Sequence, residues 1–221
     1  MSVVPSPASI QDALARRDLH DIPALPGRSN HLRAGVLVPL RWDARRLVCI
    51  ATQRTAHLRQ HAGEVVFPGG KPDPSDIDLV HTALREAEEE LGIQDAVPLG
   101  PLSAMPLFTS DYRLVPTVAQ LGPQPLVPAA AEVARVFEID VMALLNGRQL
   151  SGIPWPQFEG TPPSPIFELP GAVMYGATAH TFYELLEVVA LAAGLAMPGW
   201  ELDTWRWDFS VNRPLKNGGV V

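Results

Sequence analysis

The chain has 221 residues, a formal net charge of −7 and one cysteine. Its length suits one domain with a sizeable core, and its composition, 47% hydrophobic and 19% charged, is ordinary for a soluble globular protein. The negative charge argues against a nucleic-acid surface, which needs clustered cations. Cys49 is alone, which excludes a disulfide framework, and we expect its thiol to be buried.

Nothing in the sequence predicts passage into or across a membrane. No run reaches the roughly 18 apolar residues of a membrane span, and residues 1–21 lack the basic start and apolar core of a secretion signal. The last residues, NGGVV, are not a peroxisomal address. We therefore expect a cytoplasmic protein with no membrane partner.

The first expected elements are a helix and a hairpin. Residues 9–17, SIQDALARR, predict a short helix with Ser9 as its N-cap and Asp12 completing a capping pair. Two apolar runs, at 34–42 and 46–53, contain β-branched residues and are separated by a short turn. This pattern predicts a β-hairpin.

A basic loop is expected to follow the hairpin and to lead into a strand over 63–67. Its cationic side chains form a polar surface in one interpretation and hold substrate phosphates in the other. We favour the second, because arginine suits bidentate phosphate contacts. Zinc binding is disfavoured, since no cysteine accompanies the histidines and zinc sites usually need three or four protein ligands. The loop carries Arg54, His57, Arg59 and His61.

The central stretch of the chain runs from Phe67 to Ile93, FPGGKPDPSDIDLVHTALREAEEELGI. It predicts a strand end, a turn at Gly69-Gly70, a short acidic loop, and then a helix that ends at Gly92 as C-cap. At about 100° per residue, the apolar side chains of this helix gather on one arc. They are Val80, Ala83, Leu84, Ala87 and Leu91.

A neighbouring arc of the same helix carries Glu86, Glu89 and Glu90. Such an acidic run is often only a solvated face. However, three adjacent carboxylates repel one another unless a cation lies between them, and hard divalent cations take oxygen ligands together with water and substrate phosphates. Because the glycine pair precedes the helix and can bring a backbone carbonyl to the carboxylates, we favour a site for Mg²⁺ or Mn²⁺.

Beyond this helix the sequence predicts further strands and loops. Strands are expected over 97–106 and 114–121, and the proline-bearing stretch 122–130 is expected to be a loop. Glu132 lies at the start of the next apolar run, 131–145. It is a late carboxylate for the metal site, a catalytic base, or a helix-start glutamate favoured by the helix dipole.

The last third of the chain is less regular. Residues 152–169 form the longest irregular stretch and are typical of a lid or binding loop, in which Trp155 and Phe158 either stack on an adenine ring or pack at the surface. A last strand over 172–175 and a helix to about residue 195 follow. The final segment, with three tryptophans, is an edge strand or a dimer contact.

The acidic helix and the segment before it resemble a known family. Arg85 to Ile93, REAEEELGI, fits the closing half of the Nudix box, R-E-U-x-E-E-x-G-U with U apolar, at every specified position. The segment from Thr52 to Gly70 resembles the signature of the coenzyme A pyrophosphatase branch, T-x-R-[S/A], three residues, Arg, three residues, Gly, three residues, FPGG. Thr55 departs from it, since the pattern has Ser or Ala there.

A second departure concerns the acidic loop. The general Nudix pattern has a glutamate eight residues before the arginine, and Ile77 stands at that position, between Asp76 and Asp78. The loop is also one residue longer than the general pattern. The coenzyme A branch has a similarly acidic and extended loop, so the departure does not predict a loss of activity. It leaves open which acid holds Arg85.

The resemblance implies the Nudix fold, an α/β arrangement with a mixed β-sheet sandwiched between α-helices, over residues 31–195. An N-terminal helix and connector at 1–30 and a C-terminal extension at 196–221 flank it. The implied activity is that of a pyrophosphohydrolase, which acts on acid anhydrides in phosphorus-containing compounds. The implied metal ligands are Glu86, Glu89, Glu90 and a carbonyl of Gly69 or Gly70, with Arg85 in the catalytic group.

The implied substrate-binding residues are Arg54, Arg59, Gly69, Gly70 and Lys71, and the base stays open between Glu89, Glu132 and metal-bound hydroxide. The branch signature points to coenzyme A or its thioesters, cleaved to 3′,5′-ADP and (acyl-)phosphopantetheine. The alternatives are a broader hydrolase for ADP-ribose or dinucleoside polyphosphates, and a non-catalytic nucleotide-binding regulator. The expected partners are a small nucleotide and, at the C-terminal segment, a second copy of the chain.

Overall fold

The computed structural model describes residues 3–44, 46–155 and 161–217. Its main sheet has the order β3-β2-β1-β7-β5, with β4 paired to β1, β6 to β7 and β8 to β2. Among these pairs β1 and β7 are parallel and the others are antiparallel, so the sheet is mixed. Its strands are β1 (Leu32–Asp43), β2 (Arg46–Arg54), β3 (Val65–Val66), β4 (Gly69–Gly70), β5 (Ala96–Pro101), β6 (Met105–Pro106), β7 (Tyr112–Leu121) and β8 (Val133–Asp140).

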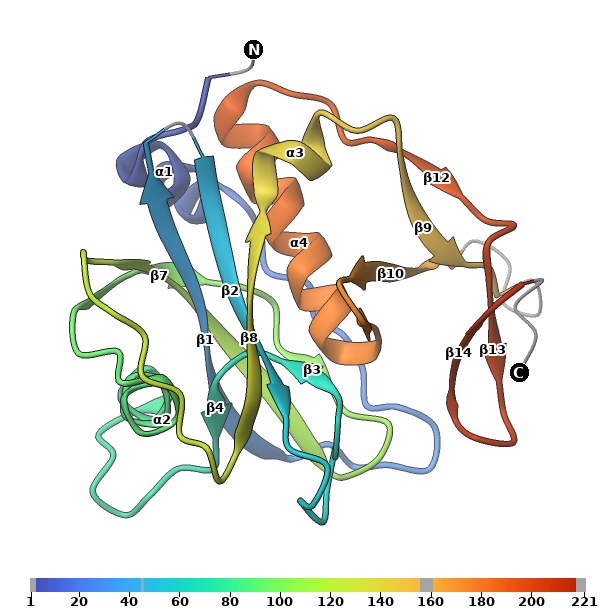
Figure 1. Cartoon of the computed structure of the whole chain (residues 1–221), viewed down its shortest axis with the longest axis horizontal. Coiled ribbons are helices and arrows are strands. Elements are labelled where there is room, and N and C mark those ends of the chain that lie inside the picture. Colours follow the sequence, from blue (N-terminus) through green and yellow to red (C-terminus); the bar gives the residue numbers. More distant parts are fainter. Residues whose placement is uncertain (1–2, 45, 156–160, 218–221) are drawn as a thin grey trace.

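Helices cover both faces of this sheet. Figure 1 shows α2 and α4 on opposite sides of β1 and β2. Helix α1 covers the same face as α4, because Ile10 and Leu14 lie in the core that contains Phe182. The expected α/β fold, a mixed sheet between helices, is therefore confirmed. The helices are α1 (Pro7–Arg16), α2 (Leu79–Leu91), α3 (Val141–Leu145) and α4 (Gly176–Ala193), and no helix of the described residues has the length and hydropathy of a membrane span.

The two layers arise from alternation along the central strands. In β1, Val36 and Val38 pack in the core that contains Phe182 of α4, whereas Leu37 packs in the core that contains Ala83 of α2. Successive side chains of a strand point to opposite faces, so a strand that is apolar throughout needs cover on both. Each fully buried aliphatic side chain contributes about 1.5–3 kcal/mol of transfer free energy.

The predicted hairpin is confirmed, because β1 and β2 pair in antiparallel register. The predicted start of the first helix is wrong. Ser6, not Ser9, is the N-cap of α1, and its side chain accepts a hydrogen bond from the backbone N–H of Ser9. Pro7 explains the difference: its fixed φ and missing N–H suit the first helical position, so the helix begins there. Asp12 instead faces Arg16 one turn later, at 3.8 Å.

Residues 152–169 were expected to be irregular, and this is wrong for most of the part that the structure describes. β9 (Gln149–Ile153) pairs with β10 (Ser164–Leu169), and Ile153 and Ile166 are buried against Trp205. The strands belong to a second sheet of order β11-β10-β9-β12, with β11 (Ala172–Met174) and β12 (Gly199–Glu201). These strands form through pairing of β9 with β10 and with β12. The local sequence pattern on which the prediction was based does not indicate such pairing.

The strand predicted as the last one is β11, but the chain continues in β12 and in a hairpin of β13 (Trp205–Asp208) with β14 (Arg213–Lys216). The Trp155 indole N–H donates to the Ser164 hydroxyl at 2.7 Å, and its ring lies 6.2 Å from that of Trp207. Trp155 is thus packed against the C-terminal hairpin. Phe158, named with it as a stacking residue, lies outside the described residues.

Candidate functional site

Helix α2 is fixed at both ends and along one face. Its N-cap, Asp78, accepts a hydrogen bond from the His81 backbone at 2.8 Å, and Gly92 ends it in the left-handed conformation with φ 68°. Ala83, Ala87 and Leu91 are fully buried, as the apolar arc predicted. This packing fixes the rotation of the helix about its axis, and therefore the direction in which each glutamate points.

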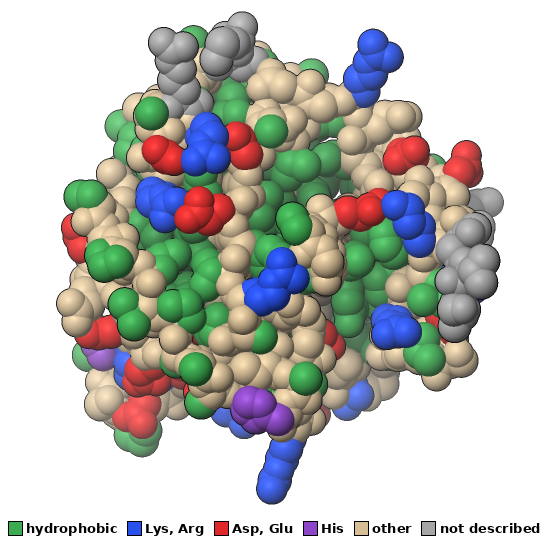
Figure 2. Space-filling view, in the orientation of Figure 1, with side chains coloured by type: hydrophobic (Ala, Val, Ile, Leu, Met, Phe, Trp, Pro, Cys, Tyr) green, Lys and Arg blue, Asp and Glu red, His purple; other side chains and the backbone are tan. Residues whose placement is uncertain are grey.

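The three predicted glutamates lie in different surroundings. The side chains of Glu90 and Glu86 are 4% and 18% exposed, whereas that of Glu89 is 60% exposed. Figure 2 shows acidic side chains gathered over α2, and the exposed carboxylates of this helix are Glu88 and Glu89. The structure thus brings Glu86 and Glu90 inward and leaves Glu89 on a solvated face.

The glycine pair of β4 lies directly against the inward carboxylates. The Gly69 backbone lies close enough to Glu90 to lower the pKa of its carboxyl group, although burial outweighs this effect. A Cβ atom at Gly70 would lie 2.4 Å from a carboxylate oxygen of Glu86, so any side chain there would displace that carboxylate. The predicted turn at Gly69-Gly70 is wrong, because these residues form strand β4, which pairs with β1. The expected close approach is present, since both glycines bring the backbone close to acidic side chains.

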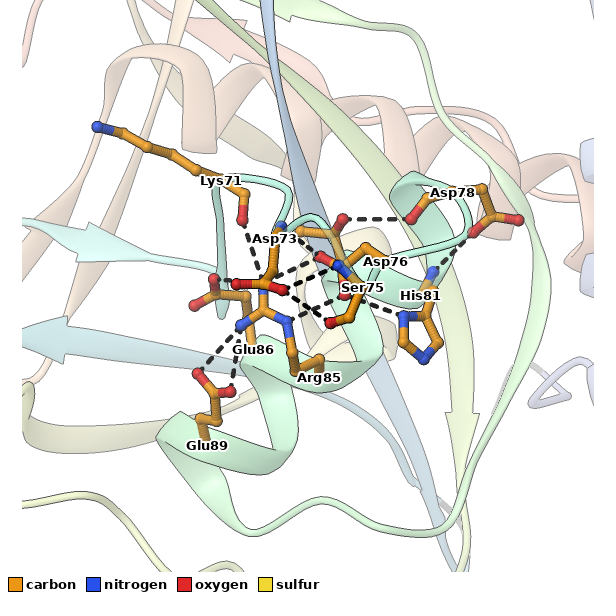
Figure 3. A network of polar contacts seen from close by, with 10 residues as sticks. Lys71, Asp73, Ser75, Asp76, Asp78, His81, Arg85, Glu86 and Glu89 are labelled. Carbon is orange, nitrogen blue, oxygen red and sulfur yellow. Dashed lines mark hydrogen bonds and ion pairs between the residues drawn. The ribbon is translucent and has the colours of Figure 1, made fainter.

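Arg85 is held by Asp76, which answers the question that the sequence left open (Figure 3). The Arg85 Nε–H and Nη2–H groups donate to the two oxygens of Asp76, each at 3.1 Å. Such bidentate pairs are strong and fix the plane of the guanidinium. Ile77, at the position of the missing glutamate, is 86% exposed and takes no part in this contact.

The same guanidinium joins three further oxygen-bearing groups. It donates to the Lys71 carbonyl at 3.1 Å, to Glu86 at 3.0 Å and to both oxygens of Glu89 at 3.1 and 3.2 Å. Arg85 therefore ties the acidic loop to the helix and sets the position of Glu86. Glu89 is occupied by this contact and does not lie with the inward pair.

Asp76 is itself enclosed, with 1% of its side chain exposed. It accepts hydrogen bonds from the Asp73 backbone at 2.8 Å and from His81 Nδ1 at 2.9 Å. The hydrogen bonds from Arg85, followed by those from its other neighbours, hold the pKa of Asp76 well below its usual range. The carboxylate is thus ionised throughout the physiological range.

Arg54 and Glu132 complete the surroundings of the inward carboxylates. Arg54 Nη1 lies 3.9 Å from a Glu90 oxygen, and the Arg54 side chain is 23% exposed. Burial raises the pKa of Glu90 to about 8; Arg54 opposes that rise, and the charges of Glu132 and Glu86 add to it. Burial also raises the pKa of Glu86, with smaller contributions from Glu89 and Glu132.

Glu132 precedes β8 and does not start a helix, so that interpretation is wrong. Hydrogen bonds from the basic loop hold its backbone. The Thr55 N–H donates to the Glu132 carbonyl at 2.8 Å, and the Thr55 hydroxyl and His57 Nε2 donate to the Ala131 carbonyl at 3.1 and 3.0 Å. Thr55, which departs from the family pattern, thereby positions a third carboxylate.

Two predicted substrate-binding residues are not drawn into this cluster. Arg59 is exposed. The Lys71 side chain points away from Arg85 in Figure 3, with Nζ 5.1 Å from the centre of the Tyr112 ring. His61, another residue of the basic loop, is engaged by Glu64, with 2.8 Å between its Nδ1 atom and a carboxylate oxygen.

Glu86 and Glu90 are suited to a divalent cation. Within residues 3–44, 46–155 and 161–217, no group of three His, Cys, Asp or Glu side chains is already arranged to hold a metal. The inward pair nevertheless offers hard oxygen donors one helical turn apart, and both pKa values are raised because burial leaves their charge undercompensated. A divalent cation would supply the positive charge that compensates these two carboxylates.

Comparison with known proteins agrees with this geometry. The NUDIX domain model matches residues 31–151, more than half of the chain. The chain belongs to the Nudix family. It is 40% identical over 144 residues to the Uncharacterized Nudix hydrolase NudL of Photorhabdus laumondii, over 62% of this chain and 75% of that protein. It is 41% identical over 120 residues to the protein of the same name from Yersinia pestis, where the alignment spans 52% of this chain and 58% of the relative.

A solved structure supports the fold. The Nudix hydrolase from Nitrosomonas europaea superposes with a TM-score of 0.50 and 14% identity, over 85% of this chain and 82% of that one. Membership of the family makes the chain a Nudix pyrophosphohydrolase that acts on a nucleoside-diphosphate-linked substrate. Nudix hydrolases use divalent cations such as Mg²⁺ or Mn²⁺.

Proposed function

We propose that this Nudix hydrolase cleaves the pyrophosphate linkage of coenzyme A or its thioesters, to 3′,5′-ADP and (acyl-)phosphopantetheine, with Mg²⁺ or Mn²⁺. The observation that carries the proposal is the place of Arg54. This residue belongs to the upstream signature of the coenzyme A branch, and its side chain lies 3.9 Å from Glu90 of the Nudix helix. The two motifs therefore meet at one site.

In this proposal the inward carboxylates of Glu86 and Glu90 hold the cation, with a carbonyl of the glycine pair. When bound, the cation polarises phosphoryl oxygens and lowers the pKa of water. Arg85 keeps Glu86 in place through the contact at 3.0 Å. Glu89 serves as a partner of Arg85 and not as a bridging ligand, because both its oxygens are engaged there.

Arg54 and Arg59 stabilise the negative charge on the diphosphate as bonding changes. Arg54 does so from within the cluster, and Arg59 from the exposed basic loop, where substrate brings its own phosphates within reach. We assign the removal of a proton from water to Glu132. It lies close enough to Glu90 and Glu86 to shift their pKa values, and it carries no ion pair of its own among the described residues.

The alternatives are a broader nucleoside-diphosphate-linked hydrolase and a non-catalytic nucleotide-binding regulator. The regulator drew support from the missing glutamate at Ile77, and the pairing of Asp76 with Arg85 removes that support. No feature of the site favours ADP-ribose or a dinucleoside polyphosphate over coenzyme A.

One experiment separates the three. The purified protein is incubated with Mg²⁺ or Mn²⁺ and, in parallel, with coenzyme A, ADP-ribose and a dinucleoside polyphosphate, and the products are separated by chromatography. The proposal expects 3′,5′-ADP from coenzyme A, at a kcat/KM above the values for the other two. Preferred cleavage of either other substrate makes the broader hydrolase correct, and tight binding without turnover makes the regulator correct.

A further inference from the structure

Arg54 lies beside buried carboxylates without a hydrogen bond to them. Its Nη1 atom is 3.9 Å from the nearer Glu90 oxygen, beyond the roughly 2.7–3.2 Å of a hydrogen bond. Its Nε atom is one of three buried side-chain nitrogen or oxygen atoms, among the described residues, that have no hydrogen-bond partner. Leaving such a donor unpaired costs free energy, which suggests a partner that the chain itself does not supply.

The backbone directs this side chain towards the cluster. The pairing of β2 with β8 shifts by one residue between Gln53, opposite Arg135, and Arg54, opposite Val133. A bulge of this kind re-aims side chains. The Arg54 N–H donates to the Glu64 carbonyl at 3.0 Å. The backbone geometry of β2 therefore determines the direction of the Arg54 side chain.

The charges around Glu90 do not balance. When all three are ionised, Glu90, Glu86 and Glu132 carry three negative charges. Arg85 pairs with Glu86 at 3.0 Å, and Arg54 is the cation that lowers the pKa of Glu90. Arg54 therefore occupies the electrostatic role that a divalent cation fills when it binds the same carboxylate. The two cations repel each other at this range.

We infer that Arg54 is an exchangeable counter-ion, which attends Glu90 in the metal-free protein, is displaced when a divalent cation binds, and then donates its free Nε–H to a substrate phosphate. The inference rests on the proposed function, since it places a cation and a diphosphate at this site. It makes metal loading and phosphate binding favour each other, and such coupling is reciprocal.

The first test measures Mg²⁺ binding by calorimetry without substrate, at pH 9 so that protons do not compete for the carboxylates. Arg54→Gln removes the competing cation, and we expect it to bind Mg²⁺ about tenfold more tightly than the wild type. Arg54→Lys keeps the charge and is expected to lie between the two. Circular dichroism and thermal unfolding show whether each variant is folded.

Arg41→Gln is the matched control. Arg41 has a side chain that is 24% exposed and forms an ion pair with Glu138 at 2.7 Å, so its burial and its partner type match those of Arg54. It leaves the carboxylate cluster unchanged and is expected to leave the Mg²⁺ affinity unchanged. Unchanged or weaker binding by Arg54→Gln overturns the inference, as does equal tightening by Arg41→Gln.

The second test follows the Arg54 Nε–H signal by NMR of protein with ¹⁵N-labelled arginine, assigned from its absence in Arg54→Lys. Addition of Mg²⁺ is expected to shift this signal, and addition of inorganic phosphate is then expected to shift it further downfield. Phosphate without Mg²⁺ is expected to have little effect. A signal that ignores Mg²⁺, or responds to phosphate equally without it, overturns the inference.

These readouts separate the inference from the proposed function, because neither requires turnover. If Arg54→Gln tightens Mg²⁺ binding and coenzyme A is not cleaved, the counter-ion role stands and the substrate proposal fails. If coenzyme A is cleaved and the Mg²⁺ affinity of Arg54→Gln does not rise, the substrate proposal stands and the counter-ion role fails.

Discussion

Arg85 and Asp76 face each other through two parallel hydrogen bonds, each of 3.1 Å. They lie nine positions apart in the chain, and the pair closes the acidic loop onto helix α2. Through the same guanidinium, the loop is joined to Glu86, an inward carboxylate of the site. The loop is thus a support of the site and not only a connection.

Asp76→Asn leaves Arg85 without its charged partner, and Glu86 then loses its fixed orientation. We expect kcat to fall roughly 10- to 100-fold, as for other residues that position metal ligands. The double variant Asp76→Asn with Ile77→Glu is expected to stay as impaired, because the side chain at position 77 points into solvent. Steady-state kinetics decides; recovery of kcat in the double variant would show that the general Nudix position is the one that matters.

Glu90→Gln is expected to abolish metal-dependent turnover and to stabilise the metal-free protein at alkaline pH. Burial raises the pKa of Glu90 from 4.5 to about 8, so the folded protein binds a proton that the unfolded chain has lost in that window. The free energy of unfolding therefore falls as pH rises from 4.5 through 8. Removing the ionisable group is expected to restore about 2–4 kcal/mol at pH 9.

Urea unfolding in the presence of EDTA measures this gain. Repeating it with Mg²⁺ is expected to stabilise the wild type but not Glu90→Gln. A loss of stability in the metal-free variant at pH 9 would instead mean that Glu90 is a structural residue.

Thr55→Val removes the hydroxyl that donates to the Ala131 carbonyl while keeping the shape of the side chain. The turn that carries Glu132 then loses one of its ties to the basic loop. We expect kcat to fall about 3- to 10-fold with KM nearly unchanged. Thr55→Ser keeps the donor and is expected to keep the wild-type kcat, so a serine variant as slow as the valine variant counts against the positioning role.

His180 makes stability sensitive to mild acid. Burial lowers its pKa from 6.5 to about 4, so the unfolded chain binds the proton first as pH falls. The free energy of unfolding is therefore expected to drop from pH 6.5 towards pH 4, by about 2 kcal/mol at pH 5. Urea unfolding at a series of pH values measures this dependence. The free energy of unfolding of His180→Gln is expected to fall less between pH 6.5 and pH 4 than that of the wild type, and an equal fall in both proteins would show that His180 is not responsible.

The sequence predicts the parts of the site that depend on local pattern. The apolar arc of Ala83, Ala87 and Leu91, the cap at Gly92 and the close approach at the glycine pair are all in the structure. Each follows from residues within one or two turns of one another. The hairpin of β1 and β2 was predictable for the same reason.

Contacts between distant segments were not predictable in this way. The partner of Arg85 moved by one position because the loop is one residue longer, and the bulge that directs Arg54 depends on the pairing of β2 with β8. Glu132 reaches the cluster only because Thr55 and His57 bind its turn. The spacing of residue types along the sequence does not indicate these contacts.

The central claim is that Glu86 and Glu90 together hold the catalytic cation. Crystals grown with Mn²⁺ test it most directly, through the anomalous signal of the metal. We expect a peak at about 2.0–2.3 Å from oxygens of both carboxylates, beside the glycine pair. A peak elsewhere in crystals of active protein, with these oxygens bound only to water or to Arg54, would contradict it.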